Sequence, residues 1–559
     1  MLELLAFGLA AVAVIVALQA LADRTGLPAA ALLTIAGLVY AVLPGPDVTL
    51  HPDVILTLVI PPLIYSAALN SSLLAIRKNL RVVISLSIGL VLASSLAVGA
   101  GIDLFVPGAG LAAGVALGAA VAPTDPVAAL AVGGRAGLPA RLITIIEGEG
   151  LLNDATALTI LTVAVTAATS GGFSLGDAVL RFLAEAAGGL LAGVAVALVV
   201  RGLRSALRDP LLVNCISLAT PFAAYLLGEE THVSGVLAVA VAGLMVGHDT
   251  PRFTTGASRL QASAVWRLVD FLLQGFVFLL IGQQLLPVVR GLKAYPASTI
   301  AGAVILTLGV VLLLRPLWLL LTQSLPGALH TRLGGAAQTG SPRDSRRLRG
   351  REIVVLSWAG TRGVISLAAI FTLPLTTSAG HPFPDRDLLL FCTYVVVVVT
   401  LAGQGVTFGP IVRALGVGAD PADAAALRNE ARAAAAQAGL SRLDQITTEL
   451  EVPGAALAGL RASLEGQLRR YQQAGAPDSA TDSATDRTDG VDGTDGRDPA
   501  SPAGPDQEAV LDTRRAVIDA EREELLRWRD AGRLPDASLR ILNRELDHEE
   551  RTVTSREGL

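Results

Sequence analysis

Residues 121–126 read Val-Ala-Pro-Thr-Asp-Pro, and residues 146–155 read Ile-Glu-Gly-Glu-Gly-Leu-Leu-Asn-Asp-Ala. Both stretches lie within otherwise apolar segments. Carboxylates at membrane depth are costly, and they usually mark an ion or proton pathway. The prolines on either side of Thr124 and Asp125 interrupt a helix, because each removes a backbone donor and clashes with the preceding turn. The two stretches therefore predict a broken membrane helix beside a helix that carries carboxylates.

The composition indicates a polytopic, all-α membrane protein. The chain has 559 residues, of which 52% are hydrophobic and 16% charged, and its mean hydropathy is +0.58. A soluble domain does not reach these values. The net charge of −5 gives no sign of a nucleic-acid partner, and two cysteines are too few for a disulfide framework. The sequence indicates neither an enzyme nor a bound cofactor.

Hydropathy predicts about 13 transmembrane helices, at roughly 20 apolar residues for each crossing. The predicted spans are 2–22, 27–43, 52–69, 80–104, 110–133, 141–169, 176–200, 210–228, 231–247, 262–289, 296–324, 351–374 and 386–415.

Arginine and lysine residues orient these spans, because short cytoplasmic loops are enriched in them. Alternate loops are basic; they contain Arg24, Arg77 with Lys78 and Arg81, Arg135 with Arg141, Arg201 with Arg204 and Arg208, Arg252 with Arg259, and the arginines of 332–351. The alternation places the N-terminus outside and the C-terminal tail in the cytoplasm. We expect the plasma (inner) membrane as the location and the lipid bilayer as a partner.

A second interruption is predicted at residues 357–364, Ser-Trp-Ala-Gly-Thr-Arg-Gly-Val, where Gly360 and Gly363 loosen a helix around Arg362. It follows the first interruption by seven predicted spans. Broken helices at corresponding positions of two halves indicate inverted repeats with a midplane site. No repeat of individual residues supports this symmetry, which is inferred from position alone. Where the two unwound helices cross, Asp125 and Arg362 would each neutralise a pair of like dipole ends.

The helix after the first interruption presents a candidate cation site. Glu149 and Asn153 lie one turn apart on one face, and Asp154 turns toward the adjacent flank. A hard cation stripped of water needs several oxygen ligands, which Asp154, Asn153, Thr124, Asp125 and freed carbonyls offer. A buried carboxyl such as Asp154 also retains a proton, which an arriving cation would displace.

This competition predicts antiport of a cation against H⁺ by alternating access. Asp154 and Asp125 are the predicted exchanging carboxylates, and Asp154 with Thr124 contacts the transported metal ion. Because Asn153 is neutral, one proton for each monovalent cation, an electroneutral exchange, is the simpler stoichiometry. Glu149 is predicted to form a structural ion pair with Arg362. Glu147 receives no role.

These residues resemble the monovalent cation:proton antiporter family, which includes NhaP-type antiporters and sodium/proton exchangers. Thr124-Asp125-Pro126 is similar to the unwound-helix motif of the family, Glu149-x-x-x-Asn153-Asp154 to its ion-binding helix, and Gly360-Thr-Arg362-Gly363 to its arginine segment. The likeness covers residues 1–415. It implies a thirteen-helix homodimer in which a six-helix core domain moves against a dimerisation domain, with Asp154 as the essential carboxylate.

Two departures from the family bear on ion selectivity. Many members have serine where this chain has Gly150, and some have an acid in the third span where it has Ser66. Two further charged residues in apolar spans, Asp270 and Arg315, are expected near cytoplasmic helix ends, where snorkelling or a local pair accounts for them.

Beyond the membrane domain the sequence predicts helical segments at 416–474 and 506–559. They are joined by a flexible acidic linker at 475–505, whose aspartate spacing does not fit a calcium loop. The favoured function is exchange of Na⁺, Li⁺ or K⁺ for H⁺ in pH and sodium homeostasis. The alternatives are a K⁺-selective exchanger, and a gated cation channel or transport-dead sensor with a signalling tail. The sequence does not distinguish Na⁺ from K⁺.

Overall fold

The computed structural model describes residues 2–25, 29–43, 55–127, 129–130, 133, 137–170, 175–207, 209–324, 348–418, 421–449, 454–474 and 505–555. Within these ranges the regular structure is helical, apart from an isolated β-bridge between Thr376 and Pro382. The chain divides into two compact units. The apolar unit is Met1–Phe253 with Gln261–Gly418, and the tail unit is Thr254–Leu260 with Ala419–Leu559.

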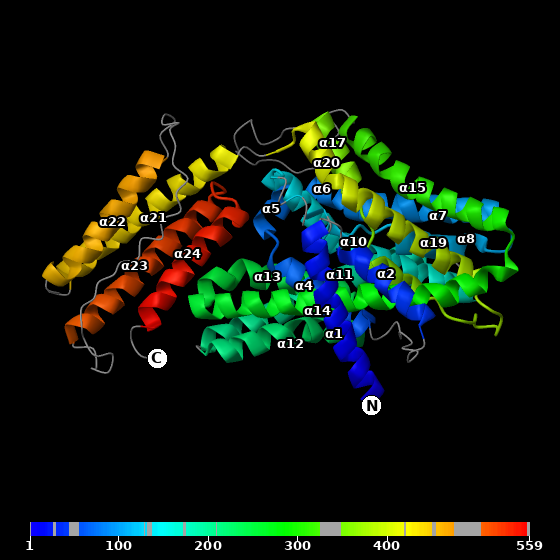
Figure 1. The fold of residues 1–559 in the computed structure, drawn as a ribbon, viewed down its shortest axis with the longest axis horizontal. Helices are drawn as coiled ribbons and strands as arrows, with labels where there is room; N and C mark the ends of the chain where they lie inside the picture. Colours follow the sequence, from blue (N-terminus) through cyan, green and yellow to red (C-terminus); the bar gives the residue numbers. More distant parts are fainter. Residues whose placement is uncertain are drawn as a thin grey trace. The chain divides into compact units, whose positions relative to one another are not determined.

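The apolar unit is built from the helices labelled up to α20 in Figure 1. Their bounds are α1 Leu2–Thr25, α2 Ala29–Val42, η1 Ile55–Val59, α4 Ile60–Leu69, α5 Leu73–Lys78, α6 Leu80–Ile84, η2 Ser85–Leu90, α7 Val91–Phe105, α8 Gly110–Val121, α10 Ala140–Ser170, α11 Leu175–Ala206, α12 Pro210–Glu230, α13 Gly235–Phe253, α14 Gly256–Gly291 (which begins in the tail unit), η3 Leu292–Ala294, α15 Ala297–Ser324, α17 Gly350–Trp358, α18 Val364–Phe371, α19 Arg386–Val399, η4 Thr400–Gln404 and α20 Gly405–Leu415.

Local sequence signals explain several helix ends. Asp209 precedes α12 and accepts the backbone N–H of Leu211 at 2.8 Å, while Pro210 opens the helix with a suitable φ. Helix α20 ends at Leu415, and the next residue, Gly416, has a left-handed φ of 59° that stops the helix. These short-range devices set where helices begin and end, independently of how the helices pack.

Within the described residues, eight helices are long and apolar enough to cross a membrane. They cover Ala6–Thr25, Leu80–Phe105, Ala140–Thr169, Val179–Ala206, Pro210–Glu230, Gly256–Ala294, Ala297–Thr322 and Arg386–Leu415. The other predicted spans overlap helices that are not among these eight, such as α2, α8 and α13, so the total of about 13 spans stays a prediction.

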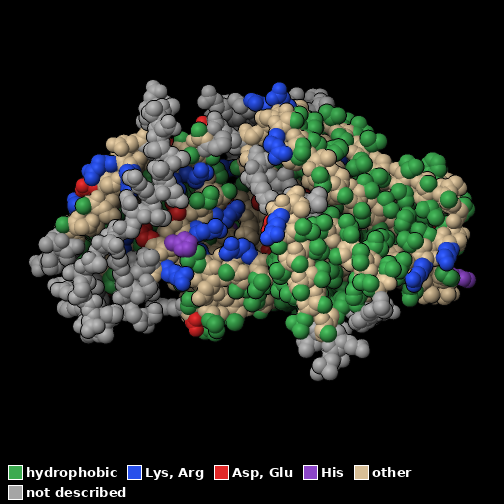
Figure 2. Space-filling view, in the orientation of Figure 1, with side chains coloured by type: hydrophobic (Ala, Val, Ile, Leu, Met, Phe, Trp, Pro, Cys, Tyr) green, Lys and Arg blue, Asp and Glu red, His purple; other side chains and the backbone are tan. Residues whose placement is uncertain are grey.

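The surface of the apolar unit suits a lipid environment. Leu313 and Leu317 of α15 are 70% and 60% exposed, and Figure 2 shows hydrophobic side chains spread over the face of this unit. Apolar surface of this extent is not left in water by a soluble protein. The fold is therefore that of a multi-pass membrane protein, as the composition predicts.

The tail unit contains α21 Pro421–Glu449, α22 Gly454–Ala474, α23 Pro505–Asp530 and α24 Asp536–Ser555. Figure 1 shows these helices side by side, and their apolar faces form buried clusters around Trp528 and Leu443. Helices are thus present where the sequence predicts tail segments. The predicted linker 475–505 lies outside the described residues except for Pro505, where α23 begins.

A buried charge network joins parts of the tail unit that are distant in sequence. Arg259 donates from Nε to Asp547 at 3.1 Å. Arg522 donates to the same carboxylate at 3.1 Å and to Glu550 at 2.7 Å. The backbone N–H of Gly256 also donates to Glu550, at 3.4 Å. The network anchors the first turn of α14 to α23 and α24.

Candidate functional site

The first predicted interruption is present. Helix α8 ends at Val121, and helical structure resumes only at Pro126. The intervening residues Ala122–Asp125 are not helical. Pro123 and Pro126 cannot donate backbone hydrogen bonds, so the ladder fails at this point.

The second predicted interruption is also present. Helix α17 ends at Trp358, and α18 begins at Val364. The five residues between them carry Gly360, Thr361, Arg362 and Gly363. We call the two unwound segments, 122–125 and 359–363, the crossing.

The two segments of the crossing bind each other through their backbones. The N–H of Asp125 donates to the carbonyl of Thr361 at 2.7 Å, and the Thr361 hydroxyl donates to the carbonyl of Asp125 at 2.8 Å. Polar backbone groups that leave a helix inside a membrane protein must find partners elsewhere. Each break supplies partners for the other.

Arg362 binds carbonyl groups at the ends of both first half-helices. Its Nε donates to Val121 at 2.9 Å and its Nη2 to Ala122 at 3.4 Å, both at the C-terminal end of α8. Its Nη1 donates to Gly360, just beyond α17. The side chain is 2% exposed. A buried cation at two helix C-termini is where the dipoles favour it, as the sequence predicts for Arg362.

Asp125 occupies the opposite ends. Its Oδ1 accepts the N–H of Val127 at 2.9 Å, at the start of the resumed helix. Its Oδ2 lies 1.8 Å from the position that a Cβ on Gly363 would take, directly before α18. Only glycine allows this approach. Asp125 therefore lies at the N-terminal ends of both second half-helices, where a negative charge is favoured.

The predicted ion pair between Glu149 and Arg362 is wrong. Glu149 instead binds Arg315 of α15 through both guanidinium Nη atoms, with Nη2 2.9 Å from Oε2. Arg315 also donates from Nε to the carbonyl of Leu356, at 2.8 Å. The reason is that the guanidinium of Arg362 is already used by the helix-end carbonyls.

For Arg315 the sequence predicts either snorkelling or a local pair near a helix end; the structure shows a pair, with Glu149 of α10, but not a position near a helix end. Arg315 is 2% exposed and lies nine residues before the end of α15 at Ser324, which is about 14 Å at 1.5 Å per residue. A signal for this was present in the sequence, because that depth exceeds what a side chain spans comfortably to reach water.

Thr124, Glu149 and Asn153 form one hydrogen-bonded group. The Thr124 hydroxyl donates to Glu149 Oε1 at 2.9 Å. The amide of Asn153 donates to the carbonyl and to the hydroxyl oxygen of Thr124, at 3.1 Å each. Asn153 Oδ1 is buried, and no described residue donates to it. A buried acceptor without a donor is rare and indicates that a water molecule or an ion binds there.

Asp154 lies beside this group and is 6% exposed. It has no hydrogen bond or ion pair with any other residue that the structure describes, whereas Asp125 is near enough for the two negative charges to repel. An isolated buried carboxylate is unfavourable unless a proton or a cation neutralises it. Asp154 and Asn153 Oδ1 thus supply oxygen atoms to which no described residue donates a hydrogen bond.

Close packing explains why position 150 is a glycine. A Cβ at this position would lie 2.7 Å from Cγ of Pro126, closer than real contacts allow. The first interruption and α10 therefore approach each other too closely for a larger side chain. Pro126 occupies the space that the side chain of a serine at position 150 would need.

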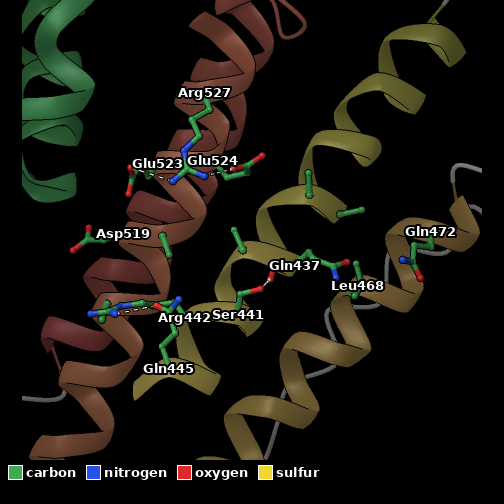
Figure 3. A pocket seen from close by; sticks show the side chains of 15 residues that line it. Gln437, Ser441, Arg442, Gln445, Leu468, Gln472, Asp519, Glu523, Glu524 and Arg527 are labelled. Atoms are coloured by element: carbon green, nitrogen blue, oxygen red, sulfur yellow. Dashed lines mark hydrogen bonds and ion pairs between the residues drawn. The ribbon is translucent and has the colours of Figure 1, made fainter. Parts of the chain in front are cut away.

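The tail unit contains a hollow of about 980 Å³ between α21, α22 and α23, drawn in Figure 3. Its charged residues are largely paired with each other: Arg527 binds Glu524 at 2.9 Å and Glu523 at 3.2 Å. Paired surface charges leave little for a ligand, so this hollow does not compete with the crossing as a candidate site.

Comparison with known proteins identifies a family. A family model described as "Sodium/hydrogen exchanger, transmembrane" matches residues 10–414. An uncharacterised Na⁺/H⁺ exchanger of Mycobacterium tuberculosis is 33% identical over 565 residues, which cover 98% of this chain and 96% of the relative. A sodium, potassium, lithium and rubidium/H⁺ antiporter of Bacillus subtilis is 32% identical over 334 residues, covering 58% of this chain and 48% of that protein.

A solved structure shares the fold. The sodium proton antiporter MjNhaP1 from Methanocaldococcus jannaschii aligns with a TM-score of 0.55 and 16% identity, covering 74% of this chain and 99% of that one.

Proposed function

Because the chain belongs to the sodium/hydrogen exchanger family, a family of transporters and not of enzymes, we propose that it exchanges Na⁺, or Li⁺ or K⁺, for H⁺ by alternating access. The observation that supports this most is the buried carboxylate of Asp154 beside Oδ1 of Asn153, neither of which has a partner among the described residues. A group that must bind two cargoes in turn cannot have a permanent partner.

The proposed site combines four residues. Asp154 holds either the proton or the cation, and Asn153 Oδ1 supplies a neutral oxygen. Thr124 contributes its hydroxyl oxygen, and Asp125 adds negative potential from the crossing. Several oxygen ligands compensate a cation for its lost water. When the cation leaves, a proton on Asp154 removes the cost of a bare buried carboxylate.

Glu149 is assigned a structural role in this mechanism. Its charge is neutralised by Arg315 and its Oε1 is held by Thr124. The pair orients Thr124 toward Asn153 without binding cargo itself. Arg362 and Asp125 also have a structural role, because their charges compensate the partial charges of the helix ends that meet at the crossing.

We further propose an electroneutral exchange of one H⁺ per cation, because a neutral asparagine precedes Asp154. The protein would act as a homodimer of inverted repeats in the plasma membrane, with its N-terminus outside and its tail in the cytoplasm, in pH and sodium homeostasis. An exchange current that depends on membrane voltage would contradict the stoichiometry alone.

The central test uses purified protein in proteoliposomes with an imposed pH gradient. Adding Na⁺, Li⁺ or K⁺ outside should dissipate the gradient, and Asp154→Asn should abolish the response in every cation. Asp103→Asn, at an exposed position in the last turn of α7, is the matched control and should behave as wild type. A gradient that persists in all three cations would sink the antiport proposal. Cation flux without proton flux would indicate a channel instead.

A further inference from the structure

A second polar pair lies between α4 and α14, two helices of the apolar unit. The hydroxyl of Ser66 donates to Asp270 Oδ2 at 2.5 Å. Ser66 is 1% exposed. The other carboxylate oxygen of Asp270, Oδ1, is buried and receives no hydrogen bond from the described residues. The expectation that a local pair near the helix end accounts for Asp270 is therefore only half met, because one hydroxyl satisfies one oxygen.

Aromatic packing holds this pair in place. Trp266, one turn before Asp270 on α14, lies with its ring centre 5.3 Å from that of Tyr65. Its Nε1 donates to the hydroxyl of Ser217 on α12, at 3.1 Å. Consecutive residues of α4 thus contact positions one turn apart on α14. The orientation of Asp270 toward α4 is imposed by these neighbours.

The charge of Asp270 has no compensating cation within the described part of the chain. Ion pairs of arginine involve other carboxylates there, and nearby Arg267 donates to the carbonyl of Ser263. A purely structural partner for Ser66 would not need a charge, since asparagine accepts the same hydrogen bond. A carboxylate kept in an apolar span indicates an occupant that comes and goes.

The pair shares its surroundings with the proposed site. Leu151 and Ala155, on either side of Asp154 in α10, belong to the same buried cluster as Tyr65 and Ala68 of α4. Ser66 lies between those two α4 residues. Residues that flank Asp154 and residues that flank Ser66 therefore pack in the same buried cluster, to which Trp266 of α14 also belongs.

We propose that Asp270 and Ser66 form a second binding station for the transported monovalent cation, occupied before or after Asp154. Asp270 Oδ1 and the Ser66 oxygen would be protein ligands, and water would complete the shell. This rests on the proposed function, which it deepens by adding a residue that affects cation affinity.

The test compares Asp270→Asn with wild type and Asp103→Asn in proteoliposomes. The variant keeps the acceptor for Ser66 but loses the charge. We expect the half-saturating cation concentration to rise about tenfold, while the maximal rate stays within about twofold, because Asp154 still performs the exchange. Ser66→Ala should shift the same parameter in the same direction by a smaller factor. Unchanged half-saturation, or a shifted pH profile alone, would overturn the station.

Binding of ²²Na⁺ to purified protein separates this proposal from the antiport proposal and bypasses variants that transport poorly. Asp154→Asn should retain Na⁺ binding, and the Asp154→Asn/Asp270→Asn double variant should lose it. Loss of all binding in Asp154→Asn alone would overturn the second station while leaving antiport intact. If wild type shows no exchange at all, antiport fails, whereas the binding comparison still decides about Asp270.

Discussion

The crossing and the tail unit both bury charges, yet they satisfy them in different ways. In the tail unit, Asp547 is shared by Arg259 and Arg522, so its carboxylate has charged partners on two sides. Beside the crossing, Asp154 has no such partner among the described residues. The difference separates charges that hold a structure together from a charge that is left available, because a permanent ion pair would compete with any cargo.

Within the site region the same contrast appears between Glu149 and Asp154, five residues apart on α10. Glu149 is neutralised by Arg315, whereas Asp154 forms no ion pair within the part of the chain that the structure describes. Position on the helix decides this, since five residues correspond to a rotation of about 140°. One face of α10 is directed toward α15 and the other toward the available site.

The largest expected effect comes from breaking the Glu149–Arg315 pair. Glu149→Gln or Arg315→Met leaves the other partner buried and uncompensated, which costs about 3–5 kcal/mol. Thermal unfolding in detergent measures it. The double variant Glu149→Leu/Arg315→Met should recover much of the loss.

A double-mutant cycle sharpens this result. The coupling energy of Glu149 with Arg315 should greatly exceed its coupling with Arg362, because only the former pair is in contact. A larger coupling to Arg362 would reinstate the partner that the sequence predicts.

A smaller effect is expected in the tail unit. Asp547→Asn removes the charge that Arg259 and Arg522 share, and should destabilise the tail unit by about 2–3 kcal/mol. The matched control is Asp444→Asn, whose partner Arg461 is 46% exposed, and where solvent screening limits the loss to less than about 1 kcal/mol. Hydrogen exchange of the α23 and α24 amides in the full chain measures the destabilisation caused by each variant. Equal effects would remove the distinction between buried and exposed pairs.

The tail unit also contains a pH-dependent element. Burial raises the pKa of Glu521 from 4.5 to about 6. Below pH 4.5 the carboxyl is protonated in both folded and unfolded chains. Between pH 4.5 and 6 the unfolded chain loses its proton first, so the free energy of unfolding falls as pH rises, by about 2 kcal/mol in total.

Glu521→Gln should abolish this contribution. The ratio of wild-type to variant amide exchange rates in α23, taken at each pH, is the measurement, because intrinsic exchange chemistry cancels in it. A ratio that does not increase between pH 4.5 and 6 would contradict a raised pKa of Glu521 in the folded chain.

The smallest effect is expected at Gly150. Serine would place its Cβ 2.7 Å from Pro126, and a small shift of the proline ring should limit the cost to about 1 kcal/mol. Gly309→Ser in α15, where no atom lies within 4 Å of the added Cβ, serves as the control and should be neutral or slightly stabilising. Identical melting temperatures for the two variants would show that the crossing is looser than these contacts indicate.

The sequence predicts a large part of the fold and of the site. Pro123 and Pro126 locate one break, and Gly360 and Gly363 the other, because both act on backbone hydrogen bonds within a few residues. The sequence also predicts that Arg362 lies at helix C-termini, because the negative end of a helix dipole is always its C-terminal end. The partner of Glu149 does not follow, because it depends on the rotation and depth of α15 against α10.

The order of residues along the chain is enough to specify where apolar helices form, where two of them must break, and which polar residues would be costly to bury. These properties depend on local backbone chemistry and on transfer from water. The packed helices add that Arg315 neutralises Glu149, that Asp270 binds Ser66, and that Asp154 has no ion pair or hydrogen bond with the residues that the structure describes. Such contacts depend on how helices distant in the chain are rotated and shifted against one another, which no short stretch of residues specifies.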